Sequence, residues 1–239
     1  MTPSRALLSL ALAAVILWRN LPVGLLCLSP GWMRFRRLEG DDQVDLSFAA
    51  LLEEELVPLG FRRLGTHLER PPLGRGTVCY DFVHEGEGAF ATAFGSRGDV
   101  IFYLLTPLSQ GGFVLTANHS RQGVERQGYL SGGIPDAPPE QLLPVHRRRV
   151  ERLKEQGLTP TADLSMEGRL AAAVAWSRGK GVRETRLKSA NAFILCLMGV
   201  VILIAVIQAG LRARPAPSAP RALVVPAKVS PPPTQEAVP

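Results

Sequence analysis

The longest apolar stretch of the chain lies near its C-terminus, between Lys188 and Arg212. Residues 189–211 carry no charged side chain, and their apolar positions cover every side of a helix instead of one stripe. As a helix this segment would be about 35 Å long, enough to cross a hydrocarbon core of about 30 Å. The pattern therefore predicts a transmembrane helix over 189–211, with Gly199 as a candidate point of contact with another helix. A buried core helix is the alternative, but the rest of the chain is too small to wrap this segment.

A second apolar stretch opens the chain, at about 6–28. Its first part has the length of a signal-peptide core, but a suitable small-residue cleavage site does not follow it. A full span would have to carry Arg19, at a cost of about 2.5–3.5 kcal/mol at the midplane, against about 0.3–0.6 kcal/mol gained for each Leu, Ile and Val. We predict an N-terminal membrane segment over 1–33 with an uncleaved span at about 6–28. A cleaved signal peptide and an interfacial or looped hairpin are the alternatives.

The region between the two stretches, 34–188, has the mixed pattern of one folded domain. Apolar residues at helical spacing predict a helix over about 46–59, which Asp45 or Ser47 can cap and Gly60 can end. Short alternating runs separated by Gly-containing turns follow between 61 and 119. They are typical of an antiparallel β-meander of four strands, or five with 63–70. The run 100–105 is apolar on both faces and belongs in the centre of the sheet.

Two further helices are expected after a Gly- and Pro-rich loop at 132–139. The first ends at Gly157, and the second is predicted to start at Thr159–Pro160 and to reach a joint at Gly179 and Gly181. The expected fold class is α+β: an antiparallel β-meander of four to five strands packed with about three helices, plus one C-terminal transmembrane helix and an N-terminal membrane segment. Residues 212–239 are rich in Pro and Ala and are predicted to form a disordered tail.

The net charge of +6 is unevenly distributed along the chain. Residues 34–188 hold 21 Lys and Arg against 20 Asp and Glu, so most of the excess belongs to the two ends. This balance argues against a nucleic-acid partner for the domain. The three cysteines form no disulfide pattern, because Cys27 and Cys196 fall in the apolar segments and Cys79 alone lies in the domain. That usage suits a reducing compartment.

Basic residues that flank the apolar segments predict the orientation in the membrane. The outer flanks carry four and the domain side carries eight, namely Arg34, Arg36, Arg37, Arg178, Lys180, Arg183, Arg186 and Lys188. By the positive-inside rule, the chain is expected to be an integral protein of the inner or plasma membrane, with the domain in the cytoplasm and the C-terminal tail outside. A cleaved signal peptide would invert this orientation.

Candidate chemistry in the domain is sparse. The motif GEGAFA at 86–91 matches the residue pattern GxGxxA of a dinucleotide-binding fingerprint. Such a motif must be followed by a helix, and here alternating strand residues follow it instead. Closely spaced His and Cys ligand pairs are missing, so neither a cofactor nor a metal is expected. One catalytic alternative combines Cys79, Asp81 and His119 as nucleophile, orienting acid and base, if adjacent strands align them.

The helix predicted before Gly157 carries five basic residues within eight positions, Arg147, Arg148, Arg149, Arg152 and Lys154. Such a cluster can contact anionic lipid headgroups or a protein partner. Its alternative is a solvated face whose charges pair with Glu151 and Glu155. The predicted function is a membrane-anchored, non-catalytic binding or scaffold module of unknown ligand. The alternative function is a membrane-bound hydrolase that uses Cys79, Asp81 and His119.

Overall fold

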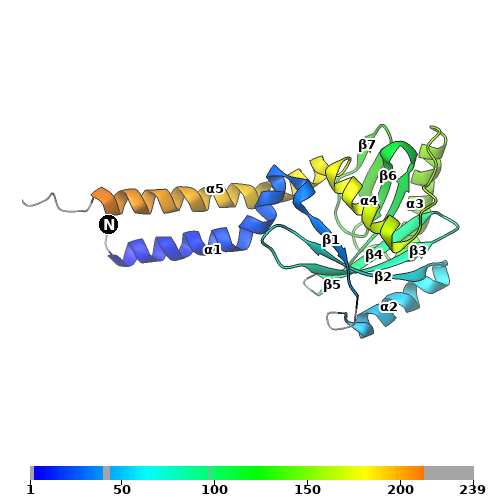
Figure 1. Ribbon diagram of the computed structural model, residues 1–239, viewed down its shortest axis with the longest axis horizontal. Helices are drawn as coiled ribbons and strands as arrows, with labels where there is room; N and C mark the ends of the chain where they lie inside the picture. Colours follow the sequence, from blue (N-terminus) through cyan, green and yellow to red (C-terminus); the bar gives the residue numbers. More distant parts are fainter. Residues whose placement is uncertain (1–2, 40–43, 97, 213–239) are drawn as a thin grey trace, which may run out of the picture.

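The computed structural model describes residues 3–39, 44–96 and 98–212. Two long helices, α1 (Pro3–Leu28) and α5 (Val182–Arg212), lie side by side and project from one end of an α+β domain (Figure 1). The domain confirms the α+β class expected from the sequence. Apart from Arg212, which ends α5, the predicted disordered tail lies outside the described residues.

One eight-stranded mixed sheet forms the centre of the domain, in the order β1-β2-β3-β4-β5-β6-β8-β7. Neighbouring strands are antiparallel except for β6 and β8, which are parallel. The strands are β1 (Arg34–Arg37), β2 (Arg62–Arg70), β3 (Thr77–His84), β4 (Ala89–Ser96), β5 (Asp99–Leu108), β6 (Gly112–Ala117), β7 (Val124–Arg126) and β8 (Tyr129–Gly133).

The prediction of four to five strands in a purely antiparallel meander is wrong in number and in one pairing. The meander from β2 to β6 is present, and β5, which contains the doubly apolar run, lies inside the sheet as expected. The missed strands are short: β1 and β7 have 4 and 3 residues, and β8 has the sequence YLSGG. Strands like these lack a clear alternating pattern and form because a neighbouring edge offers hydrogen bonds. The chain reaches β8 only after the edge strand β7, which makes β8 parallel to β6.

Helices cover both faces of the sheet. On one face, α2 (Leu46–Leu56) and α3 (Pro139–Lys154) pack against alternate residues of the strands, such as Phe102 and Leu104 of β5. On the other face, α4 (Met166–Arg178) packs against the residues between them, such as Tyr103 and Leu105. This alternation follows from the period of two along a strand. It determines which side chains of the sheet α4 covers.

The ends of two helices test the predicted boundaries. Oδ1 of Asp45 accepts hydrogen bonds from the backbone N–H of Ser47 and Phe48, both at 3.0 Å, so α2 begins as predicted. A short 3₁₀ turn, η2 (Val57–Leu59), continues it to Gly60, which has a φ of 90°. The helix predicted from Thr159–Pro160 is wrong, because α4 begins at Met166, after Ser165.

The reason for this difference lies in the backbone of the loop before α4. The carbonyl of Thr159 accepts a hydrogen bond of 2.7 Å from the N–H of Ser109, and Pro160 forms an isolated bridge with Leu108. This extended pairing replaces the first turn of a helix. Instead, Oγ of Ser165 accepts a hydrogen bond of 3.0 Å from the N–H of Gly168 and caps α4. The joint predicted around Gly179 is confirmed, since α4 ends at Arg178 and α5 begins at Val182.

Two helices of the described chain are long and apolar enough to cross a membrane, Ser4–Leu28 within α1 and Val182–Arg212. They approach closely at two glycines. A Cβ on Gly24 would lie 3.2 Å from Sγ of Cys196, and a Cβ on Gly199 would lie 3.0 Å from Cγ of Leu17. The contact predicted at Gly199 is therefore confirmed, and its partner is α1.

Candidate functional site

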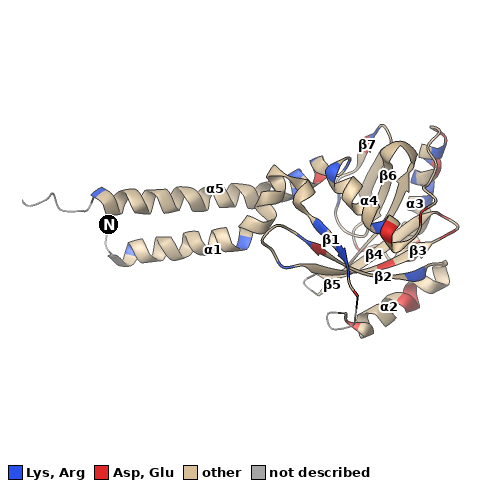
Figure 2. Ribbon diagram, in the orientation of Figure 1, with Lys and Arg blue, Asp and Glu red and all other residues tan. Residues whose placement is uncertain are grey.

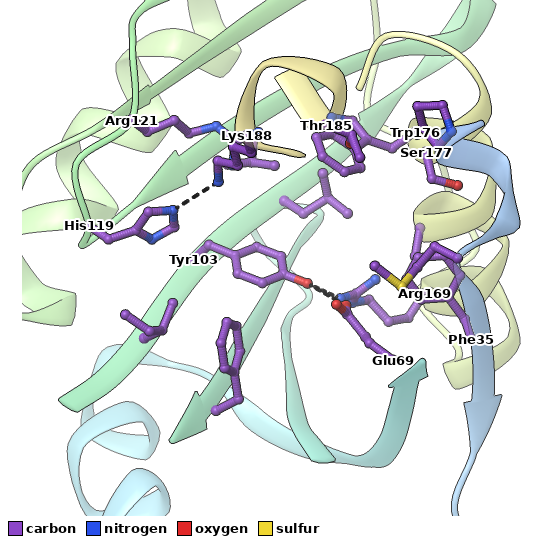
Figure 3. Close-up of a pocket in the computed structure, with 17 residues that line it drawn as sticks. Phe35, Glu69, Tyr103, His119, Arg121, Arg169, Trp176, Ser177, Thr185 and Lys188 are labelled. Carbon is purple, nitrogen blue, oxygen red and sulfur yellow. Dashed lines mark hydrogen bonds between the residues drawn. The ribbon is translucent and has the colours of Figure 1, made fainter. Parts of the chain in front are cut away.

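A cavity of about 340 Å³ lies between α4 and the sheet, where the domain meets the two long helices (Figure 3). Its lining comes from the segment after α1, from β1, β2, β4, β5 and β6, from the loop after β6, from α4 and from the start of α5. Most of the lining side chains are apolar, among them Phe35, Phe94, Ile101, Leu115, Ala173 and Trp176. Apolar walls with a few polar groups are typical of small-molecule sites.

Polar side chains from the sheet gather beneath α4. Asp81 of β3 pairs with Thr92 of β4, which pairs with Tyr103 of β5, so these three form one row across the sheet. On β2, His67 pairs with Cys79, two positions from Asp81. Because side chains two positions apart share a face, all five lie on the side that α4 covers.

Arg169 of α4 enters this polar group and is completely buried. Its Nε donates to Oδ1 of Asp81 and to Oγ1 of Thr92, each at 3.1 Å. Its Nη2 donates to Oγ1 of Thr92 at 2.8 Å and to Oη of Tyr103 at 2.6 Å. Its Nη1 is buried and has no hydrogen-bond partner among the described residues. Moving a guanidinium group from water into the protein interior costs several kcal/mol unless the group is paired. Asp81 supplies the counter-charge.

His67 lies between two carboxylates. Its Nδ1 contacts Oδ2 of Asp81, and its Nε2 lies 3.2 Å from Oε1 of Glu69. Burial alone would lower the pKa of His67, but the hydrogen bonds to Asp81 and Glu69 outweigh it and raise the pKa above its ordinary value. Tyr103 also donates to Oε1 of Glu69, at 3.3 Å, which joins this pair to the Arg169 group at the cavity wall (Figure 3).

A second polar group lines the cavity near the start of α5. Nζ of Lys188 lies 3.4 Å from Nε2 of His119 (Figure 3). Burial, together with the charges of Lys188 and Arg121, lowers the pKa of His119 to about 4, so its ring is neutral near pH 7. Arg121 forms a buried ion pair with Glu184 of α5, whereas Lys188 forms no ion pair with a carboxylate within the described ranges. Lys188 is therefore a cation available to a bound anion.

Of the three predicted catalytic residues, Cys79 and Asp81 share a face of β3, but His119 does not join them. Asp81 is committed to His67, Thr92 and Arg169. His119 follows β6, three strand positions from β3, which corresponds to about 14 Å at the usual strand spacing. Burial raises the pKa of the Cys79 thiol far above its ordinary value, so the thiolate that a nucleophile needs is disfavoured. This geometry gives the hydrolase alternative no support.

The basic residues predicted for lipid or partner contact lie on α3, at the end of the domain away from α1 and α5 (Figures 1 and 2). Three of them form exposed ion pairs: Arg147 with Glu87, Arg152 with Glu125, and Lys154 with Glu151.

Of the remaining two basic residues, Arg149 is half-buried, and its Nη1 donates to Oγ1 of Thr116 at 2.9 Å. Arg148 is exposed. Contact of this face with headgroups or a partner stays a prediction, and its position favours a protein partner over lipid next to α1 and α5.

Most of the site was missed in the sequence: His67, Glu69, Thr92, Tyr103 and Arg169 were not singled out, and Lys188 was named only as a flanking charge. A signal existed for His67 and Glu69, because the alternation that places Cys79 and Asp81 on one face also applies to β2. Arg169 gave no signal, since an arginine in a helix is usually taken as exposed.

Nitrogen, oxygen and sulfur donors also meet in this region. A ring nitrogen of His67, a carboxylate oxygen of Glu69 and Sγ of Cys79 lie within 4.8 Å of one another. These residues come from two strands, so the spacing along the chain did not reveal them. Together the site offers an apolar cavity, a buried charged network at one wall and an accessible cation at another.

No protein-family model, curated protein or solved structure matches the chain.

Proposed function

We propose that the protein is a membrane-anchored, non-catalytic binding module whose cavity takes an amphiphilic ligand with an apolar body and an anionic group. The observation that carries this proposal is the combination, in one cavity of about 340 Å³, of mainly apolar walls with Lys188, a cation without a paired carboxylate among the described residues. An apolar body can fill the cavity while Lys188 binds the anionic group.

Two unpaired nitrogen atoms support binding of a polar group in this cavity. Nη1 of Arg169 and Nδ1 of His119 are buried without hydrogen-bond partners among the described residues, and both side chains line the cavity. Buried polar atoms are normally hydrogen-bonded, so these two are available to a bound molecule. The other charged groups are committed to one another, which favours binding over catalysis.

The position of the cavity supports an amphiphile as the ligand. The segment after α1 and the start of α5 both contribute to its lining. If α1 and α5 span a membrane, the cavity lies near its surface, where amphiphilic molecules collect. We propose the orientation that the flanking charges favour, with the domain in the cytoplasm, the C-terminal tail outside, and an inner or plasma membrane as the location.

The test measures energy transfer from Trp176, which lines the cavity, to cis-parinaric acid, a fluorescent fatty acid. The full chain is placed in lipid nanodiscs after Trp18→Phe and Trp32→Phe, which leave Trp176 as the donor. We expect saturable transfer that Ala173→Phe weakens about tenfold or more, because the larger ring fills the cavity. Ala171→Phe, an exposed change on the same helix, should leave the affinity unchanged.

A second arm of the same titration concerns the anionic group. Lys188→Gln should weaken binding of the acid but not of its uncharged methyl ester, because only the acid carries a charge for Lys188 to bind. Equal affinities of the Ala173→Phe and Ala171→Phe variants would remove the cavity as the binding site. Equal losses for acid and ester in Lys188→Gln would remove the anionic group from the proposal.

A further inference from the structure

We propose that His67, Glu69 and Cys79 form a binding site for a divalent transition metal ion, best matched by Zn²⁺. This inference is independent of the amphiphile proposal. The three donor atoms lie within 4.8 Å of one another, on the sheet face beneath α4. His67 and Cys79 are directly opposite each other on β2 and β3, and Glu69 is two positions further along β2. The register of two strands therefore fixes the donors on one face.

The donor set matches the preference of zinc. Zn²⁺ binds imidazole nitrogen, thiolate sulfur and carboxylate oxygen, and sites with three protein ligands leave a position for water or another ligand. Ligands of a single hard type, such as a group of carboxylates, would instead favour Mg²⁺ or Ca²⁺. The mixed set of one nitrogen, one oxygen and one sulfur is therefore informative about the metal.

A second observation concerns the orientation of His67. Asp81 holds Nδ1 of this ring, which leaves Nε2 directed at Glu69, 3.2 Å from its Oε1. A histidine that binds a metal through one nitrogen usually donates its other N–H to a carboxylate, which fixes the ring. Asp81 is itself held by Thr92 and Arg169, at 2.7 Å and 3.1 Å. The supporting shell of a metal site is thus already assembled.

Only a small movement is needed to bind the ion. Zinc bonds of about 2.1 Å in tetrahedral geometry place ligand atoms about 3.4 Å apart, close to the 3.2 Å between His67 and Glu69. Sγ of Cys79 lies within 4.8 Å of the other two donors, so it would have to approach by about 1 Å at most, which a rotation of its side chain can provide. The Glu69 side chain is 23% exposed and lines the cavity, so it provides a path for the ion.

Charge balance removes the objection that Arg169 would repel the metal. With the ion bound, the carboxylates of Asp81 and Glu69 and the thiolate of Cys79 carry three negative charges, against one positive charge on Arg169 and two on Zn²⁺, so the group is neutral. The thiol loses its proton to solvent as sulfur bonds to the metal, because a coordinating dication deprotonates a thiol that burial alone keeps neutral. A neutral His67 binds the ion through Nε2 while its Nδ1–H donates to Asp81. The ion pair of Arg169 with Asp81 can therefore persist.

The experiment uses the full chain in detergent micelles, stripped of metal with a chelator and titrated with Co²⁺, which takes zinc sites and has visible absorption. We expect one equivalent to produce intense bands of tetrahedral cobalt and a thiolate-to-cobalt charge-transfer band, which Zn²⁺ then bleaches. Cys79→Ser should remove the charge-transfer band, and Glu69→Gln should weaken the affinity about tenfold or more. The control Cys27→Ser/Cys196→Ser removes the other two thiols and should retain the band.

The wild-type titration decides the proposal even if a variant fails to fold. A chain that gives no thiolate-to-cobalt band overturns it, and so does a band that survives in folded Cys79→Ser. Loss of the band in the double control variant would assign the metal to the long helices and would equally overturn it. The amphiphile titration uses no metal, so failure of either proposal leaves the other standing.

Discussion

Arg169 determines the character of the site at the scale of single residues. Its side chain is completely buried and joins α4 to three strands through Asp81, Thr92 and Tyr103. A guanidinium without its carboxylate would retain most of the cost of leaving water, so Arg169 and Asp81 depend on each other. The arrangement explains why this face of the sheet can hold polar residues where the opposite face holds Phe102 and Leu104.

His146 gives the fold a predicted sensitivity to acid. Its Nε2 and Nδ1 lie 2.9 Å and 3.0 Å from the hydroxyl oxygens of Thr106 and Thr116. Burial and the nearby Arg149 lower its pKa to about 3. The unfolded chain binds a proton at this histidine below about pH 6.5, whereas the folded chain stays neutral there until about pH 3. The contribution to stability is therefore present above pH 6.5 and is lost as the pH falls.

We expect His146→Gln, which keeps hydrogen-bonding groups between the two threonines, to reduce this loss. Between pH 7 and pH 5, the free energy of unfolding of the wild type should fall by about 2 kcal/mol more than that of the variant. The raised pKa of His67 acts in the opposite sense, since its contribution is lost as the pH rises, but it is common to both proteins. Thermal unfolding at the two pH values measures the difference, and parallel pH dependence of the two proteins would contradict it.

Close packing of α1 and α5 is the main contact at the scale of the elements. Gly24 and Gly199 allow the two backbones to approach, because neither carries a side chain to separate them. Within this pair, Cys196 is buried, with 7% of its surface exposed. In lipid, apolar side chains gain little by leaving acyl chains for one another, so close van der Waals contact has to hold the helices together.

A larger side chain at Gly199 should open the pair. In a Cys27→Ala background, we expect Gly199→Leu to increase the rate at which a maleimide labels Cys196 in detergent micelles by about fivefold or more, since the new side chain collides with Leu17. Gly210→Leu is the matched control, because a Cβ at Gly210 meets nothing within 4 Å. Equal labelling rates in the two variants would show that the glycine contact does not hold the helices together.

Elements with a strong local pattern could be predicted from the sequence, and elements that depend on distant partners could not. The cap at Asp45, the strands from β2 to β6 and the apolar α5 each follow from spacing within a few residues. By contrast, Thr159–Pro160 has the local signs of a helix start but pairs with Leu108 and Ser109 across the domain. The site could not be predicted for the same reason, since its partners Arg169 and Asp81 are 88 positions apart in the sequence.

The whole molecule separates charge from apolar surface. Charged residues concentrate on the domain, whereas the paired part of α1 and α5 is almost free of them (Figure 2). The start of α1 and the end of α5 lie together, away from the domain (Figure 1). If both helices cross a membrane, the domain lies on one side and both outer ends lie on the other, as the flanking charges also predict.

Labelling with a membrane-impermeant maleimide tests this orientation in a Cys27→Ala/Cys196→Ala background, where Cys79 is buried. We expect a cysteine appended after Pro239 to react in intact cells, and Glu155→Cys, at the exposed end of α3, to react only after lysis. The background chain without either cysteine is the control for reagent entry. Reaction of Glu155→Cys in intact cells would place the domain outside, and the cavity would then have to bind ligands from outside the cell. Reaction at both positions only after lysis would mean that α5 does not cross the membrane, because a crossing helix must separate its two ends.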